Sequence, residues 1–210
     1  MPVKEKLSYG AQLNVLKKKI IWYSIMAVTL INGALFGFFS YMSDYLRTVT
    51  EVSYSVISIL LMIYGLANIT GNVIAGKQLA TNPIRSMIFI PFALFTFYIC
   101  IFILGEWLAA MAVIILILGI LAGYGQNTMQ YMITEAAPEA PDFANGLFLL
   151  SANLGTTVGA AACGAFITFF DTRYSVIGSL LFLAVSIIFV VLRIRTVQSS
   201  KTIKLKVVAQ

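Results

Sequence analysis

The residues of this chain that could do chemistry are uncharged amides inside long apolar stretches. Asn68 and Asn72 are four residues apart, as are Gln126 and Gln130, and this spacing places each pair on one face of a helix. A carboxamide donates and accepts hydrogen bonds without carrying charge, so the chemistry open to these residues is hydrogen bonding. The amides taken as substrate-path candidates are Asn32, Asn68, Asn72, Gln126, Asn127, Gln130 and Asn153.

Two roles are open for these amides. They line a water-filled cavity, or they form hydrogen bonds that hold one helix to another. For a single amide we favour helix packing, because Asn and Gln in membranes often serve that purpose. For the clustered group at residues 126–131 we favour cavity lining.

The sequence offers few residues for proton transfer, metal binding or nucleophilic catalysis. No Asp, Glu, Lys or Arg lies in the middle of an apolar stretch, and histidine, the usual proton shuttle, is absent. The nearest coupling candidate is Asp44, at the outer end of the first stretch. Cys100 and Cys163 lie deep in apolar stretches, where packing is their natural role. We therefore expect that the chain is not an enzyme and has no catalytic residue, metal site or cofactor.

The elements that must position the amides are apolar, nearly charge-free stretches. A helix needs about 20 residues to span a bilayer, and 60% of this chain is hydrophobic while 10% is charged. The sequence therefore predicts an all-α, polytopic membrane protein with six transmembrane helices and no soluble domain. The predicted spans cover residues 20–42, 53–76, 86–105, 107–134, 143–170 and 174–192.

The positions of the charges predict the orientation. Of the 14 Lys and Arg residues, Arg47 and Arg173 fall on one side of the predicted spans, which leaves twelve on the other. The positive-inside rule then places both termini in the cytoplasm and the chain in the cell membrane. The net charge of +6 is this orientation signal, so no nucleic-acid partner is expected. The twelve cations are Lys4, Lys6, Lys17, Lys18, Lys19, Lys77, Arg85, Arg193, Arg195, Lys201, Lys204 and Lys206.

These patterns divide the chain into three segments. Residues 1–19 form a cytoplasmic segment, residues 20–192 a six-span bundle, and residues 193–210 a basic cytoplasmic tail. Within the bundle, glycines four residues apart in spans one, four and five let backbones approach closely. Each pair alone indicates tight static packing, and three such pairs favour closely packed helices with room to slide. The pairs are Gly33/Gly37, Gly119/Gly123 and Gly155/Gly159.

Two connections on the predicted cytoplasmic side carry charge. Residues 71–85 predict a tight hairpin in which glycines precede two cations, whose role is orientation or gating. Residues 134–146 hold three acids and two prolines but no basic residue, against the positive-inside trend. These acids suit the N-terminal dipole of span five, or pairing with the cations of the first connection. The gating-loop candidates are Gly71, Gly76, Lys77, Arg85, Glu135, Glu139 and Asp142.

Several runs of sequence resemble a known family. Residues 41–46, residues 61–72 and the turn at residues 76 and 77 resemble spans seven and eight of Major Facilitator Superfamily transporters. Residues 136–141, continuing through residues 153–160, are similar to spans ten and eleven of its arabinose-efflux-like, drug/proton antiporter branch. The resemblance covers nearly the whole chain but only the C-terminal half of the family fold. It implies two inverted three-span repeats with substrate bound between two halves, and it makes Tyr41 a further substrate-path candidate.

The resemblance leaves three functions open. A half-transporter, as a homodimer or with a separate N-terminal half, exports a small organic compound by alternating access across the lipid bilayer. Its partner is expected to cover the face that carries Asn32, Asn68 and residues 126–130. The alternatives are a truncated or relic half, and a membrane scaffold without transport activity. The turn between Lys77 and Arg85 also lacks the acid that the family usually carries there. A mainly uncharged lining suits an amphipathic or weakly polar compound.

Overall fold

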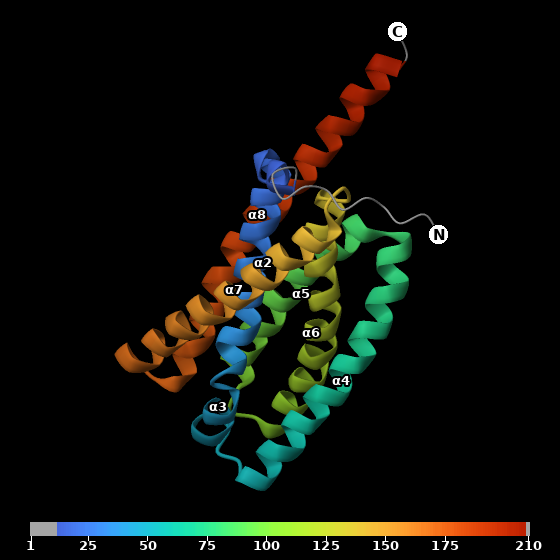
Figure 1. The fold of residues 1–210 in the computed structure, drawn as a ribbon. Coiled ribbons are helices and arrows are strands. Elements are labelled where there is room, and N and C mark those ends of the chain that lie inside the picture. The colour runs from blue at the N-terminus through green and yellow to red at the C-terminus, as the bar shows by residue number, and fades with distance from the viewer. Residues whose placement is uncertain (1–11, 209–210) are drawn as a thin grey trace.

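The structure, a computed structural model, describes residues 12–208, with side chains for residues 12–198. Between these limits it consists of helices and connecting turns without a strand, so the predicted all-α class is confirmed (Figure 1). Lys4 and Lys6 lie outside the described residues, as do the side chains of Lys201, Lys204 and Lys206. The elements are η1 (Asn14–Lys17), α2 (Lys19–Phe39), α3 (Met42–Thr48), α4 (Tyr54–Thr81), α5 (Pro83–Leu104), α6 (Leu108–Ala136), α7 (Pro141–Phe169), η2 (Thr172–Tyr174) and α8 (Ser175–Val208).

The long helices α2 and α4 to α8 are apolar enough to cross a membrane, which gives the six predicted spans. The protein is therefore a multi-pass membrane protein. α2 begins and α8 continues at one end of the bundle, called here the terminal end (Figure 1). The opposite end, called the far end, carries α3 and the α5–α6 and α7–α8 connections.

The end of α4 differs from the prediction. This helix runs to Thr81 instead of ending at Gly76, so Lys77 is helical and not part of a hairpin loop. Residues that follow Gly76 are good helix formers. The helix stops because Pro83 disfavours helical backbone at the residue before it and begins α5. The connection between α4 and α5 is thereby reduced to Asn82.

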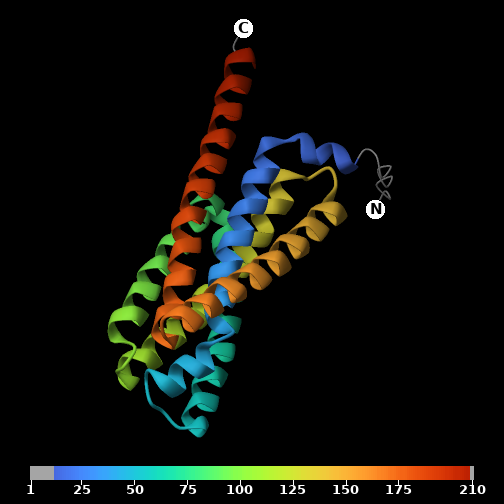
Figure 2. The same ribbon diagram turned by 90° about the vertical axis from the view of Figure 1, so that its left-hand side faces the viewer.

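Two other spans also have ends that the sequence did not reveal. α2 ends at Phe39, before the predicted end at residue 42, and the chain turns at Ser40 and Tyr41 into α3. α8 passes through the predicted boundary at residue 193 and extends beyond the neighbouring helices (Figure 2). The division into three segments remains a prediction.

The most extensive helix contacts join the first half of the chain to the second. α4 packs on α6, α2 packs on α7, and α2 also packs on α8. We divide the bundle into two three-helix units, one of α2, α4 and α5 and the other of α6, α7 and α8. In each of the two leading contacts, the first helix of one unit packs on the second helix of the other. Inverted repeats produce this pattern. The third helices of the two units, α5 and α8, lie side by side (Figure 2).

Glycines permit both leading contacts. A Cβ atom at Gly159 of α7 would collide with the backbone of Gly33 in α2. In the other contact, a Cβ atom at Gly123 of α6 would collide with the backbone of Asn68 in α4. The predicted close packing at glycine pairs is therefore confirmed at these positions, and it joins the two three-helix units.

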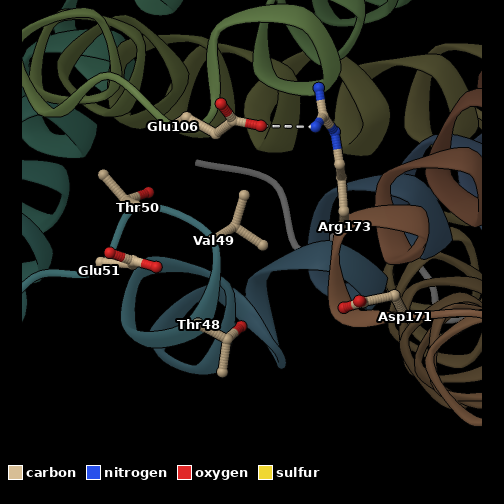
Figure 3. Close-up of a pocket in the computed structure, with 7 residues that line it drawn as sticks. All are labelled: Thr48, Val49, Thr50, Glu51, Glu106, Asp171 and Arg173. Atoms are coloured by element: carbon tan, nitrogen blue, oxygen red, sulfur yellow. Dashed lines mark hydrogen bonds and ion pairs between the residues drawn. The ribbon is translucent and has the colours of Figure 1, made fainter.

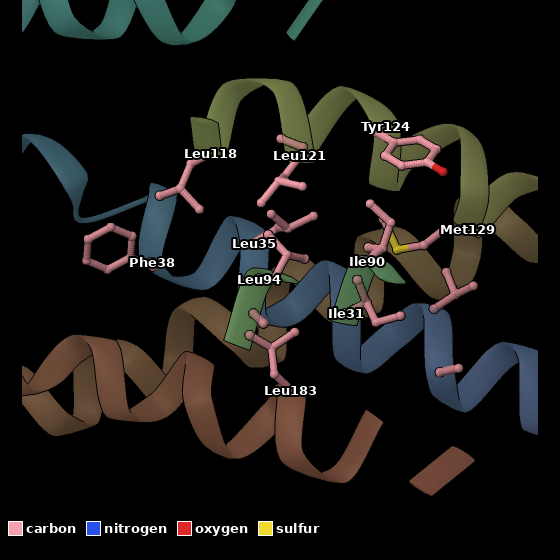
Figure 4. Packing of buried hydrophobic residues seen from close by; sticks show 14 of the residues in the cluster. Ile31, Leu35, Phe38, Ile90, Leu94, Leu118, Leu121, Tyr124, Met129 and Leu183 are labelled. Atoms are coloured by element: carbon pink, nitrogen blue, oxygen red, sulfur yellow. The ribbon is translucent and has the colours of Figure 1, made fainter. Parts of the chain in front are cut away.

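An apolar core fills the space between the more central helices (Figure 4). Ile31 and Leu35 of α2, Ile90 and Leu94 of α5, and Leu183 of α8 belong to one buried cluster, together with side chains of α6. This core fixes α2 and α6 at the centre of the bundle, and it leaves α4 and α7 less covered.

We expect Gly159→Ala to destabilise the bundle, because the added methyl group would press against the backbone of Gly33. Overpacking of this kind costs about 1–3 kcal/mol. Gly146→Ala on the same helix is the control, since nothing lies within 4 Å of a Cβ atom there. Helix propensity favours alanine at such a site by about 1 kcal/mol. Thermal unfolding of the full chain in detergent should move in opposite directions for the two variants, and equal melting temperatures would contradict tight packing at Gly159.

Candidate functional site

A row of amides crosses from α4 to α6. Asn127 donates from Nδ2 to Oδ1 of Asn72 at 2.5 Å and to the carbonyl of Gly123 at 3.0 Å. Asn72 donates in turn to Oδ1 of Asn68, one turn away on α4, at 3.1 Å. Because the backbones meet closely at Gly123, these short side chains reach across the helix contact. The row thus holds the two helices together as well as presenting polar groups.

A second group of polar side chains joins α6 to α2 and α7. Gln126 donates to Oδ1 of Asn32 at 3.0 Å. Asn32 donates to the carbonyl of Ala152 at 2.6 Å and to Oγ1 of Thr156 at 2.9 Å. Asn32 is itself buried. The prediction that a partner covers Asn32 is therefore wrong, because the close contact between α2 and α7 already encloses it.

The amides of α6 point to three different helices. Gln126 bonds α2, and Gln130 donates to Oδ1 of Asn145 on α7 at 3.0 Å. Since α2 and α7 pack against each other, these two glutamines lie on one side of α6, as their spacing predicts. Asn127 bonds α4 instead. The group therefore bridges the helices on both sides of α6.

Two further candidates lie apart from these groups. Tyr41 donates to the carbonyl of Ala160 at 3.2 Å, which joins the turn after α2 to α7. Asn153 is exposed on α7 and donates to the carbonyl of Leu149 in its own helix at 2.9 Å. Its amide oxygen accepts no bond from another described residue. Asn153 is thus available to a group outside this bundle.

Sequence reasoning missed three polar side chains near the amides. Thr156 and Asn145 accept the bonds described above. The hydroxyl of Thr29, one turn before Asn32 on α2, is buried and has no hydrogen-bond partner among the described residues. For Thr29 and Thr156 the available signal was the i,i+3 spacing of Thr29 with Asn32 and of Asn153 with Thr156, which places polar residues on one helix face. Asn145 has no such spacing from a substrate-path candidate.

α4 and α7 bury the smallest share of their residues. In the most apolar part of each span, 22% of α4 and 28% of α7 residues are buried, against 61% of α2 and 56% of α6. α5 and α8 are exposed as well, but in most of each span the exposed residues are apolar, with one exception. Thr96 is the only exposed polar residue from Ser86 to Leu104 in α5 and from Ser175 to Leu192 in α8. Exposed polar side chains occur instead along α4, α6 and α7. We define the polar face by Asn72, Gln130, Asn145, Asn153 and Thr157.

Two ion pairs hold the connection between α6 and α7 at the terminal end. Glu135 pairs with Arg193 at 2.6 Å, and Glu139 pairs with Lys18 at 2.6 Å. The hydrogen bond from Lys18 holds the pKa of the Glu139 carboxyl below its usual range. Glu135, in the last turn of α6, thus binds a residue of α8, and Glu139, in the connection itself, binds a residue that precedes α2.

The other gating-loop candidates are not brought together. Lys77, Arg85 and Asp142 are exposed, and none forms an ion pair with another described residue. The suggested pairing of the loop acids with Lys77 or Arg85 is therefore not seen. Gly71 is buried, and a Cβ atom there would collide with the α6 backbone, so it is a packing glycine and not a loop residue. Gly76 is helical and has open space around it.

A pocket of about 400 Å³ lies at the far end, and no substrate-path candidate lines it (Figure 3). Arg173 donates to Glu106 in this pocket at 2.7 Å. Three carboxylates and one guanidinium line the pocket, so its lining carries a net negative charge. No amide candidate contributes to its lining, which consists of Thr48, Val49, Thr50, Glu51, Glu106, Asp171 and Arg173.

Asp44 lies near the same end, on the short helix α3 and outside the six spans. Its carboxylate is exposed and accepts a hydrogen bond from Oγ1 of Thr172 at 3.3 Å. The coupling candidate therefore lies at the far end of the bundle and not beside the amides. Its role in coupling stays a prediction.

Comparison with known proteins adds an independent line of evidence. Residues 8–208 match the family described as Major Facilitator Superfamily. The chain is 24% identical over 161 residues to the "Probable sugar efflux transporter" of Pasteurella multocida, covering 76% of this chain and 40% of that protein. It is 30% identical over 134 residues to the "Uncharacterized MFS-type transporter YtbD" of Bacillus subtilis, covering 61% and 33%. It is also 26% identical over 149 residues to the "Transcription regulatory protein OpdE" of Pseudomonas aeruginosa, covering 69% and 37%. The chain thus spans 33–40% of the length of these relatives.

Proposed function

Because this chain belongs to the Major Facilitator Superfamily, we propose that it forms one six-span half of a transporter and acts with a second half. In such an arrangement substrate binds between the halves and is exposed alternately to the two sides of the membrane. The activity is efflux of a small organic compound. Membership of a transporter family agrees with the expectation that the chain is not an enzyme.

The polar face is the observation that carries this proposal. In hydrocarbon, an exposed carboxamide loses hydrogen bonds to water and gains none, which is unfavourable. Apart from Thr96, the spans of α5 and α8 avoid this cost with apolar surfaces, whereas α4, α6 and α7 expose amides, and α7 also exposes Thr157. The difference is explained if lipid covers α5 and α8 while a second half and a water-filled path cover the polar face.

Glycines that no neighbouring helix contacts also support a second half on α4 and α7. Gly65 and Gly76 on α4 and Gly146 on α7 have nothing within 4 Å of a Cβ position. Glycines on transmembrane helices serve close approach by another helix, yet these three meet none within this bundle. A second half that packs on α4 and α7 would use them.

The chemistry of the polar face favours an uncharged substrate. Its members are amides and one threonine, without an ionisable group. Neutral donors and acceptors on such a face suit a compound rich in hydroxyl groups. One relative is named a sugar efflux transporter, and a neutral sugar or a similar weakly polar compound is the substrate class we propose here.

We also propose that the terminal end faces the cytoplasm of a cell membrane, with residues 1–19 and 193–210 on that side. This follows from the positive-inside rule. Reporter fusions after Arg85, Asp142 and Arg195 should all give a cytoplasmic signal, and a fusion after Glu106 should not. An external signal at any of the first three positions would contradict the orientation.

Replacing one exposed polar residue on each kind of surface tests the transport proposal. Asn153 on α7 and Thr96 on α5 are both exposed, and each bonds only a carbonyl of its own helix, at 2.9 Å and 3.0 Å. Neither Asn153→Leu nor Thr96→Leu removes a bond between helices. Asn153→Leu should lower export of radiolabelled pentose or hexose about tenfold, the effect of one lost hydrogen bond of about 1.4 kcal/mol. Thr96→Leu should leave it unchanged.

The transport assay uses the natural gene product in cells preloaded with each sugar, with membrane insertion measured in parallel. Equal export by the two variants would show that the polar face is no substrate path. No export of any sugar by the unmodified protein would contradict the substrate class. It would also favour the alternatives of a relic half or a scaffold.

A photo-cross-linking side chain tests whether a second half covers the polar face. Leu149 lies one turn from both Asn145 and Asn153 on α7, and it is 52% exposed, against 54% for Leu181 on α8, so the two positions differ in helix but not in accessibility. A benzophenone side chain at position 149 should cross-link in native membranes to a second copy or to a separate six-span half. The same group at position 181 should react with lipid. Protein cross-links that are no more frequent at 149 than at 181, identified by mass spectrometry, would contradict the half-transporter proposal.

A further inference from the structure

Arg193 is the only charged residue that is buried among the side chains that the structure describes. Sequence reasoning placed it in a basic tail after the last span, yet it lies within α8 and inside the bundle. A buried cation is costly unless it is paired and hydrogen-bonded. Its surroundings therefore show what the bundle does to accommodate it.

The guanidinium group contacts three other helices. Nε donates to Oγ of Ser24 on α2 at 2.9 Å, and Nη1 donates to the sulfur of Met87 on α5 at 3.0 Å. Nη2 donates to the carbonyl of Met132 at 2.9 Å and to Oε2 of Glu135 at 2.6 Å, both on α6. Glu135 provides the only negative charge in this set. The contact thus ties α6 and α8 of one three-helix unit to α2 and α5 of the other.

The neighbouring ion pair provides a natural comparison. The Glu135–Arg193 and Glu139–Lys18 pairs both have a distance of 2.6 Å, and their carboxylates are 40% and 41% exposed. The cations differ, because the side chain of Arg193 is 2% exposed and that of Lys18 is 43% exposed. Water can replace Glu139 at Lys18, whereas it cannot reach Arg193 to replace Glu135.

We propose that Arg193 and Glu135 form a latch that holds the terminal end of the bundle closed. Release occurs from the Glu135 side, because that carboxylate is the part that solvent reaches. Without Glu135, the ligands left to Arg193 are a hydroxyl, a thioether and a carbonyl, none of which carries charge. The buried cation can then be solvated only if water enters between α2, α5, α6 and α8. The latch requires no particular substrate or partner half, so it stands apart from the proposed function.

Cysteine labelling at the terminal end tests the latch. Ile21 is fully buried on α2, one turn before Ser24, and Ile101 is fully buried near the far end of α5. Each is changed to cysteine separately, in a full chain whose Cys100 and Cys163 are replaced by alanine. Reaction with a maleimide is followed in nanodiscs, where both ends are accessible.

Glu135→Gln should speed labelling at position 21 at least about tenfold, because it leaves a buried cation without its countercharge. Glu139→Gln is the matched control and should change that rate by no more than about threefold, since its cation is solvated. Position 101 should label at the same rate in all variants. Arg193→Met added to Glu135→Gln should return the rate at position 21 toward that of the parent, because no buried charge remains.

Equal rates for Glu135→Gln and Glu139→Gln would overturn the latch. A parallel increase at positions 21 and 101 would also overturn it, since this indicates general unfolding. If Glu135→Gln fails to fold, the double variant decides: a folded double variant supports the buried-charge argument, and an unfolded one refutes it.

Discussion

Close approach of helix backbones at glycine positions is the constraint on which the rest of this bundle depends. Helices in a bilayer gain little from burying apolar surface against each other, so their association rests on packing and hydrogen bonds. Gly33 and Gly159 bring α2 onto α7, and Gly123 brings α6 onto α4. The bonding amides sit beside these glycines: Asn32 precedes Gly33, and Asn127 follows Gly123 by one turn. A bulkier residue at either contact would separate the helices beyond the reach of a side chain as short as asparagine.

The same two contacts decide which surfaces stay open. Since α2 packs on α7 and α6 packs on α4, the first helix of each three-helix unit becomes central and the second becomes peripheral. α5 and α8 complete the back of the bundle with apolar side chains. Amides of α6 then lie between buried neighbours on one side and the exposed surfaces of α4 and α7 on the other. The polar face is thus a consequence of the inverted-repeat packing and not an accident of single residues.

The number of spans and their helical class were predictable because each apolar stretch is long enough to cross a bilayer and lacks a charge in its middle. Helix ends were less predictable, since the end of α4 depends on Pro83 and not on the glycines before it. The hydrogen-bond partners of Asn32 could not be predicted from the sequence, because spacing along one helix does not tell which helix lies opposite. Arg193 was misplaced for a physical reason: a cation at the end of a span usually extends to water. Only the three-dimensional arrangement of Ser24, Met87 and Met132 around it shows that this one does not.

Charge is distributed along the bundle in a way that restricts how it can work. The middle holds neutral amides, the terminal end holds a buried cation with its acid, and the far end holds an exposed Arg173–Glu106 pair. A charged ligand in the middle would find no counter-ion among the described side chains there, and a second half would have to supply one. A neutral, hydrogen-bonding ligand needs no such help. The neutral amides therefore suit the uncharged substrate proposed above, while the ion pairs at the two ends are placed where they stabilise the positions of the helices.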